Sequence, residues 1–166
     1  MIDVTRLLGR LLKGRLPTGV DRVGIEYLRH YCHRSRLAVR FGKFFLMLPA
    51  DASVRLSLKL LNTSSRLGLS LCLLRDIWRW RPPPSGVWLI NTGHSGLEHA
   101  AYPEWIAAHK IRLLLIIHDL IPISHPQFSR EGESEKHRIR IRNALLSATG
   151  ILTNSKDTLE KLKNYA

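Results

Sequence analysis

The apolar run at residues 111–117, IRLLLII, constrains the fold more than any other segment of the chain. Arg112 is its only charged residue, and such a strand is typical of a parallel sheet that helices cover on both faces. Helical patterns separate most of the predicted strands, so the sequence predicts an α/β fold with a Rossmann-like, mostly parallel sheet and flanking helices. The other predicted strands are at 2–8, 36–41, 44–48, 86–90 and 150–153.

Capping residues and turn residues mark the ends of the predicted helices. Thr18 can cap a helix that reaches Tyr31, with Asp21 three residues later in the position of a capping box. Asp51 can cap a helix that runs toward Leu61. The remaining elements are a basic turn at 13–19, a hairpin turn at Gly42–Lys43, helices at 102–109 and 134–148, a loop at 118–128, and a terminal helix capped by Asn154 or Ser155.

Leucines recur at helical spacing between Leu56 and Leu74, so this whole region is predicted to be helical and amphipathic. One interpretation is a stripe that faces the core, as in most globular domains. The other is a helix that lies on a membrane surface with cations on its second face. The leucines are Leu56, Leu60, Leu67, Leu71 and Leu74, and the cations are Arg55, Lys59, Arg66 and Arg75.

Length and composition predict one ordinary globular domain over residues 1–166, with 45% hydrophobic and 23% charged residues. They exclude a disordered tail, a collagen-like repeat and a disulfide miniprotein. The 26 Lys and Arg exceed the 13 Asp and Glu, giving a net charge of +13. This excess favours an anionic partner: nucleic acid, an anionic membrane or a phosphorylated substrate.

Cys32 and Cys72 have no metal-type spacing, and we expect both to be reduced thiols of a cytoplasmic protein. No signal peptide is predicted, because the arginines of the first 15 residues are scattered rather than placed before an apolar stretch. No membrane-spanning segment is predicted either, since Arg55, Lys59 and Arg66 interrupt the best candidate. The expected location is therefore the cytoplasm, including peripheral contact with the inner membrane face.

Polar side chains follow three predicted strands at the point where each strand ends. They are found in the loop 91–96, at His118–Asp119 and at Asn154–Ser155. Because ligands of parallel sheets gather at the carboxyl ends of the strands, we expect these residues to line one crevice.

Two of these segments, His118–Asp119 and the loop 91–96, each have two interpretations. His118 can shuttle a proton and Asp119 can orient a hydroxyl, or His118 is satisfied by backbone and Asp119 is a turn residue before Pro122. The loop 91–96, NTGHSG, can bring backbone N–H groups close to a ligand, or it is a plain turn from strand to helix. It has neither the order of a dinucleotide loop nor that of a P-loop.

The histidines of the chain and one predicted basic helix are further candidate binding sites, for zinc and for anions. Zinc binding is not expected, because no histidine pair has HExxH spacing among His94, His99, His118, His125 and His137. A helix with Lys136, His137, Arg138, Arg140 and Arg142 is either a solvated face or a patch that binds anions.

Taken in order, several of these segments resemble the N-terminal half of GT-B glycosyltransferases of family four. The likeness is strongest to bacterial mannosyltransferase-like members of polysaccharide and O-antigen synthesis. The segments are PTGVDRV at 17–23, NTGHSG at 91–96, IHDLIP at 117–122 with His125–Pro126, and ILTNS at 151–155.

The resemblance implies a retaining transfer of a hexose such as mannose from a nucleotide sugar to a polysaccharide or lipid-linked acceptor, with no metal cofactor. It implies donor contacts at Thr18, Gly19 and Arg22, and a catalytic role for His118 and Asp119. It implies that Asn91, Gly93, His94 and Ser95 line the acceptor side, with Asn154 and Ser155 elsewhere in the cleft.

One departure from the family pattern concerns the donor-binding half. The Glu-x7-Glu motif of the family's C-terminal domain is absent from this sequence, so we expect the 166-residue chain alone to have little or no transferase activity. A C-terminal domain or partner chain would complete it. The alternative function is a non-catalytic basic module that binds nucleic acid or anionic membrane through Arg138, Arg140, Arg142 and the N-terminal arginines.

Overall fold

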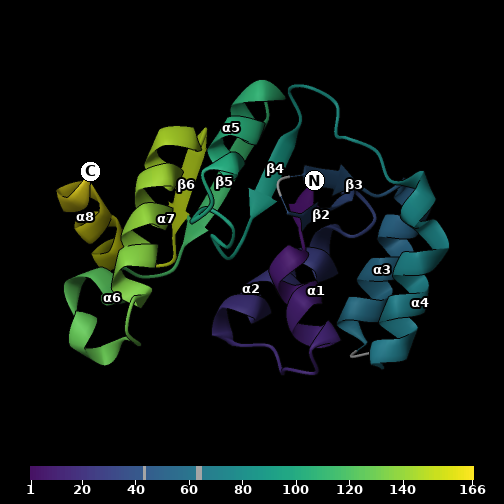
Figure 1. Ribbon diagram of the computed structural model, residues 1–166, viewed down its shortest axis with the longest axis horizontal. Helices are drawn as coiled ribbons and strands as arrows, with labels where there is room; N and C mark the ends of the chain where they lie inside the picture. Colours follow the sequence, from purple (N-terminus) through teal and green to yellow (C-terminus); the bar gives the residue numbers. More distant parts are fainter. Residues whose placement is uncertain (43, 63–64) are drawn as a thin grey trace.

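The computed structural model describes residues 1–42, 44–62 and 65–166, and it has the α/β architecture expected from the sequence. Its six-stranded sheet has the strand order β3-β2-β1-β4-β5-β6 (Figure 1). All neighbouring strands are parallel except β3, which runs antiparallel to β2. The strands are β1 Ile2–Asp3, β2 Leu37–Phe41, β3 Phe44–Met47, β4 Trp88–Asn91, β5 Arg112–Ile117 and β6 Gly150–Thr153.

The helices flank the sheet and extend past both of its outer strands (Figure 1). α3 and α4 lie at the end of the molecule near β3, whereas α7 and α8 lie at the end near β6. α1, α2 and α6 lie at the lower edge, toward which β4 and β5 point. The helices are α1 Thr5–Leu12, α2 Gly19–Tyr31, α3 Ala50–Leu61, α4 Arg66–Asp76, α5 Ala101–Ala108, α6 Ile121–Ser124, α7 Glu133–Ser147 and α8 Lys156–Tyr165, with 3-10 turns η1 Ile77–Arg79 and η2 Pro126–Phe128.

Two hydrophobic cores pack against opposite faces of the sheet. Successive strand residues point to opposite faces, so Leu37 and Val39 enter one core and Ala38 enters the other. α1, α2, α3 and α4 contribute to the first core, and α5, α7 and α8 contribute to the second. Phe45 of β3 reaches into the second core, where its ring lies 4.9 Å from that of Tyr102, centroid to centroid.

The outer edge of β3 is partly occupied by the chain itself. Met47 and Arg81 form an isolated antiparallel bridge, with N···O distances of 2.8 and 3.2 Å. The chain then enters the prolines at 82–84, which have no N–H to donate, so the pairing goes no further.

The strand predicted at 2–8 is wrong beyond Asp3. Helix α1 begins at Thr5 because Leu7, Leu8 and Leu11 recur at helical spacing and are the buried side of that helix. The central strand of the sheet is therefore only two residues long, and a helix begins almost directly at its carboxyl end.

The region 51–74 is two helices rather than one. α3 ends at Leu61 and α4 begins at Arg66, with Ser65 as its N-cap. The N-cap of α3 is Pro49, so Asp51 lies in the first helical turn, where it pairs with Arg55 and Arg79. The prediction that Asp51 caps the helix is thus wrong.

Several local predictions are confirmed. The backbone N–H of Thr18 donates to the Asp21 carboxylate at 2.7 Å, as a capping box requires. β6 has the predicted bounds, and Ser155 caps α8 by accepting the Thr158 N–H at 3.0 Å. β2 and β3 are antiparallel neighbours and Gly42 has a φ of 56°, whereas Lys43 of the predicted turn lies outside the described residues. The prediction that 118–128 is a loop is wrong over most of its length, because Ile121–Ser124 form α6 and Pro126–Phe128 form η2.

Both cysteines are free thiols, as expected, with Cys32 buried and Cys72 half-buried. Within the described residues, no helix is both long enough and apolar enough to cross a lipid bilayer.

Candidate functional site

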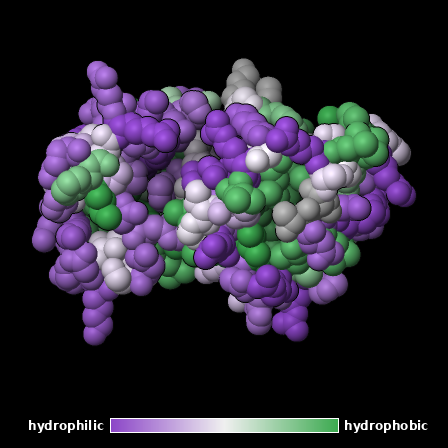
Figure 2. Space-filling view, turned by 90° about the horizontal axis from the view of Figure 1, so that it is seen from below, coloured by the Kyte–Doolittle hydropathy of each residue, from purple (hydrophilic) through white to green (hydrophobic). Residues whose placement is uncertain are grey.

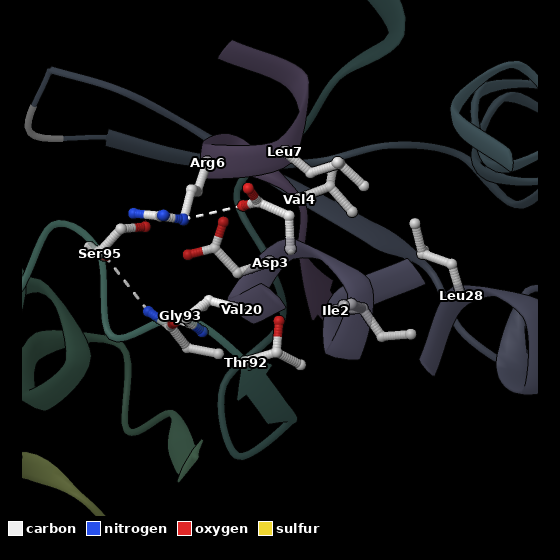
Figure 3. Close-up of a pocket in the computed structure, with 13 residues that line it drawn as sticks. Ile2, Asp3, Val4, Arg6, Leu7, Val20, Leu28, Thr92, Gly93 and Ser95 are labelled. Carbon is white, nitrogen blue, oxygen red and sulfur yellow. Dashed lines mark hydrogen bonds and ion pairs between the residues drawn. The ribbon is translucent and has the colours of Figure 1, made fainter. Parts of the chain in front are cut away.

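The candidate site lies where the strand order reverses. The chain runs from β1 outward to β2 and β3 and then returns to the other side of β1 to form β4. Loops that leave β1 and β4 therefore diverge, and a crevice opens at this point in doubly wound sheets. A cavity of about 20 Å³ lies here, lined by β1, α1, α2 and the loop after β4 (Figure 3). Its volume is that of about one water molecule.

Asp3 ends β1 and points its carboxylate into the space between Arg6, Gly93 and Ser95 (Figure 3). Its Oδ1 accepts the Thr5 N–H at 2.9 Å. Its Oδ2 is buried and has no hydrogen-bond partner among the described residues. Burial raises the pKa of Asp3, although the hydrogen bonds from Thr5 and the charge of Arg40 act in the opposite direction. The site therefore contains a hydrogen-bond acceptor, Oδ2 of Asp3, that has no donor among the described residues.

Asp21 organises the wall of the site that α1 and α2 form. Its carboxylate lies 2.9 Å from Arg6 Nε and 3.0 Å from Arg10 Nε, and it also accepts the Thr18 hydroxyl at 2.6 Å. Burial acts to raise the pKa of Asp21, but the Thr18 hydrogen bonds and the Arg6 charge outweigh it and lower the pKa. Arg6 and Arg10 thus share the single negative charge of Asp21, and the three side chains together keep one positive charge.

Two glycines allow the walls to approach each other. A methyl group at Gly93 would lie 3.1 Å from Arg6 Cδ, and one at Gly24 would lie 2.9 Å from Thr92 Oγ1. Both distances are shorter than ordinary side-chain contacts. Gly93 therefore lets the loop after β4 lie close to α1, and Gly24 lets α2 lie close to the same loop.

Asn91 holds its own loop together instead of facing the cavity with free groups. The side chain is buried, its Nδ2 donates to Tyr102 Oη at 3.0 Å, and its Oδ1 accepts the Gly93 N–H at 3.0 Å. A second bond from Nδ2 to the Ser95 carbonyl, at 3.3 Å, closes the loop. The predicted acceptor-side residues Gly93 and Ser95 line the cavity directly.

His118 is buried at the end of β5 and does not line the cavity. Its Nε2 lies 2.6 Å from the carbonyl of Thr92, and its own carbonyl accepts the Thr158 hydroxyl at 3.2 Å. Asp119 accepts the Ile121 N–H at 3.1 Å, as a turn residue does. These contacts give both residues a role in holding the neighbouring loops.

His94 is the centre of a cluster of three imidazole rings. Its ring centroid lies 6.1 Å from that of His118 and 5.3 Å from that of His137, and its Nδ1 is buried without a partner among the described residues. Burial, reinforced by His137 and His118, lowers the pKa of His94 to about 3. His94 also has a φ of 40°, in the left-handed region. Over residues 1–42, 44–62 and 65–166, no group of three or more His, Cys, Asp or Glu is placed to hold a metal ion.

The polar residues predicted from the sequence are brought to one edge of the sheet by a series of contacts. Thr18 joins Arg6 and Asp21, Arg6 packs against Gly93, and Thr92 joins His118. Thr158 then connects His118 to Asn154, whose Oδ1 accepts the Thr158 hydroxyl at 3.2 Å. Gly19, Arg22, Asn154 and Ser155 are exposed along this edge.

Five polar or glycine residues that line the cavity are absent from the predicted set of site residues: Asp3, Arg6, Asp21, Gly24 and Thr92. A signal for Asp3 exists, because it is an acidic residue between the apolar residues Ile2 and Val4. It is recognisable as a strand end only once the beginning of α1 at Thr5 is known. Arg6 and Gly24 carry no comparable signal in the sequence.

The basic helix α7 offers fewer free cations than its sequence indicates. Arg140 pairs with Glu98 and Glu133, and His137 is buried with its Nε2 3.2 Å from the Asp119 carbonyl. Lys136, Arg138 and Arg142 are the exposed members.

Comparison with protein-family models, curated proteins and solved structures found no match for this chain. The chemistry of the site therefore rests on its own groups. They are the unpaired carboxylate oxygen of Asp3, two arginines that share the Asp21 carboxylate, and the buried imidazole of His94, whose pKa is lowered. The carboxylate oxygen is a hydrogen-bond acceptor for a ligand hydroxyl.

Proposed function

We propose that the chain is the acceptor-side domain of a retaining, family-four-like GT-B glycosyltransferase. In complete form the enzyme would transfer a hexose such as mannose from a nucleotide sugar to a polysaccharide or lipid-linked acceptor. The motif resemblance at 17–23, 91–96, 117–122 and 151–155 supports this reading. The observation that carries it is the buried, unpartnered Oδ2 of Asp3 at the point where the strand order reverses.

An unpaired carboxylate oxygen suits a sugar hydroxyl, which can donate a hydrogen bond to it. It does not suit a phosphate. The N-terminus of α1 would attract an anion, but the Asp3 carboxylate already occupies it by accepting the Thr5 N–H. The cavity of about 20 Å³ has room for one hydroxyl group and not for a sugar ring, so we assign it to a single hydroxyl of the saccharide acceptor, with the rest of the saccharide outside it. The phosphates of the donor are assigned to the exposed Arg22 beside Thr18 and Gly19 at the beginning of α2.

His118 and Asp119 remain the proposed catalytic pair. Their contacts in the structure support a role in positioning the loops that form the crevice. His118 Nε2 meets the Thr92 carbonyl, and Thr92 lines the crevice beside Gly93. Because His118 does not line the cavity, its contribution in this proposal is to hold Thr92 and the loop that carries Gly93 and Ser95.

Saturation-transfer NMR on the purified chain tests the proposal. Methyl α-mannoside should show saturation, whereas mannose 6-phosphate should not, because Asp3 repels the phosphate. Asp3→Asn should weaken methyl mannoside binding about tenfold or more, which is the loss expected for a hydrogen bond to a charged group. Lys136→Gln, on the exposed side of α7, is the matched control and should bind normally. Equal binding by Asp3→Asn, or stronger binding of the phosphorylated sugar, would contradict the assignment.

The alternative of a basic module that binds nucleic acid is weakened by the ion pairs. Arg140 is paired with Glu98 and Glu133, and Arg6 and Arg10 are paired with Asp21. Tight, salt-sensitive RNA binding that is lost in Arg138→Gln/Arg142→Gln and kept in Asp3→Asn would favour that alternative.

A further inference from the structure

Helix α4 presents leucines to solvent along one side. Leu67, Leu71 and Leu74 are 69%, 58% and 64% exposed, although they recur at the spacing that places residues on one helix face. Trp78, four residues after Leu74, is 72% exposed. Of the two interpretations of the leucines between Leu56 and Leu74, the stripe that faces the core is thus confirmed for Leu56 and Leu60 of α3 and wrong for the three leucines of α4.

The core side of α4 is the opposite one. Leu69 is completely buried in the core that α1, α2, α3 and α4 share, and the buried Asp76 lies on the same side. The helix thus has apolar residues on both faces, and only one of them is covered by the chain.

The exposed side continues onto α3 and η1 as one surface. Leu58 and Leu71 line a groove of about 390 Å³ between α3 and α4. Figure 2 shows hydrophobic residues at the end of the molecule where α3 and α4 lie, with hydrophilic residues beside them. We call this surface the α4 face, which consists of Leu58, Leu67, Leu71, Leu74, Ile77 and Trp78.

The unpaired charges around the α4 face are cationic. Lys59 and Arg75 line the same groove as Leu58 and Leu71, and neither forms an ion pair with another described residue. The two carboxylates nearby are both paired with Arg55 and Arg79: Asp76 is buried, and Asp51 at the beginning of α3 is 50% exposed. The apolar strip therefore has a border whose unpaired charges are those of Lys59 and Arg75.

We propose that the α4 face docks the protein onto an anionic lipid bilayer, with α4 lying in the plane of the interface. Leucines enter the acyl boundary, Trp78 lies at headgroup depth, and Lys59 and Arg75 contact anionic headgroups. The proposal does not depend on the saccharide site, because no residue of the α4 face lines that cavity.

Charge complementarity favours a bilayer over a protein partner. A protein that covered this strip would have to supply carboxylates along its cationic border, whereas an anionic membrane supplies negative charge over its whole surface. A second copy of this chain would place Lys59 and Arg75 against the same cations.

Flotation with lipid vesicles tests the proposal. The chain should float with phosphatidylcholine vesicles that contain about 30% phosphatidylglycerol, and less with pure phosphatidylcholine. Leu67→Ser/Leu71→Ser/Leu74→Ser should lower the partition coefficient at least about tenfold, since each leucine contributes apolar burial. Lys59→Gln/Arg75→Gln should reduce the preference for anionic vesicles. The matched control is Leu16→Ser/Leu146→Ser, which removes leucines that are 78% and 77% exposed elsewhere.

A second measurement leaves the leucines intact. Brominated lipids should quench the fluorescence of the chain, and Trp78→Phe should remove most of the quenching, because Trp80 and Trp105 are buried and Trp88, which is 42% exposed, belongs to β4 and not to the α4 face. Circular dichroism verifies that the variants fold, and Asp3→Asn should float like the unmodified chain. Absence of flotation, or flotation of the triple serine variant at the unmodified level, would overturn the proposal. The proposal would also be overturned if the chain did not float but formed a dimer, and the triple serine variant dissociated that dimer.

Discussion

Asp3 places a carboxylate with an unpartnered oxygen in the interior of the fold, which opposes stability. Its carboxylate is buried with one oxygen unpartnered, so the folded state favours the protonated form and the pKa is raised. For an acid with a raised pKa, the folded state loses stability as the pH rises through the ordinary and then the raised pKa. At neutral pH the negative charge of Asp3 therefore lowers the free energy of unfolding. In the proposed function, a hydrogen bond from a ligand hydroxyl would offset this loss.

Asp3→Asn should accordingly stabilise the ligand-free protein at pH 7 by about 1 kcal/mol, because it removes the buried charge. The asparagine Oδ1 can still accept the Thr5 N–H. Urea unfolding measures the effect, and Asp157→Asn, which removes an exposed carboxylate of α8, should give no increase. A loss of stability in Asp3→Asn would show that the charge itself supports the fold.

His94 should make stability depend on pH in the opposite sense. Its pKa is lowered to about 3, so below pH 6.5 the unfolded chain takes up a proton that the folded chain refuses. Stability is present above pH 6.5 and is lost as the pH falls, by about 2 kcal/mol at pH 5 from this residue.

His94→Asn should flatten the dependence of the free energy of unfolding on pH between 7 and 5. Asparagine tolerates the left-handed backbone at this position. His137, whose pKa burial also lowers, should leave a smaller residual slope. The exposed His99 serves as the comparison, since His99→Asn should keep the full slope.

At the scale of elements, the capping box at the beginning of α2 also ties α1 to α2. Asp21 is 3% exposed and receives hydrogen bonds from Thr18 and ion pairs from Arg6 and Arg10. Asp21→Ala should destabilise the protein by about 3 kcal/mol, because it removes the cap and leaves two cations without a partner.

Urea unfolding at pH 7 measures this loss. Glu26→Ala removes an exposed partner of Arg29 on the same helix and should change stability by less than about 0.5 kcal/mol. Because the pKa of Asp21 is lowered, its contribution is present above the ordinary pKa of an aspartate and is lost as the pH falls through the lowered value. A loss of equal size in both variants would argue against a special role for Asp21.

Elements with one clear apolar pattern could be predicted from the sequence. β5 is such a case, because a strand covered on both faces reads as a continuous apolar run. β6 was also predicted with its observed bounds, although its residues are half-buried or exposed. The faces of α4 could not be predicted, since leucines at 67, 69, 71 and 74 lie around the whole helix and only packing selects Leu69 for the core.

For the candidate site, the loops after β4, β5 and β6 were predictable because each begins at the end of an apolar run. Asp3 and Arg6 were not, because the short central strand has too few residues to show a pattern. The sequence also cannot show that Asn91 and His118 satisfy their polar atoms within the protein, since the partners Tyr102 and Thr92 come from other parts of the fold.

At the scale of the whole molecule, 26 cationic side chains repel one another against 13 anionic ones. Salt screens this repulsion, and it screens the local ion pairs as well. Because the cations outnumber the acids two to one, repulsion should dominate. Raising sodium chloride from about 0.05 to about 0.5 M should stabilise the fold by about 1 kcal/mol, which is a rise in Tm of roughly 2–4 °C.

Differential scanning fluorimetry measures this rise. Arg138→Gln/Arg142→Gln lowers the net charge on the exposed side of α7 and should shrink the gain from salt. A Tm that falls with salt would mean that pairs such as Asp21 with Arg6 outweigh the repulsion.

The bridge between Met47 and Arg81, followed by the prolines at 82–84, has a consequence for self-association. Growth of a cross-strand polymer requires each subunit to offer an open sheet border at both of its ends. Here one border is obstructed by the chain itself, and β6 is left as the other. Pairing through strands is therefore favoured at β6 and hindered at β3, where Arg81 already takes up the main-chain groups of Met47.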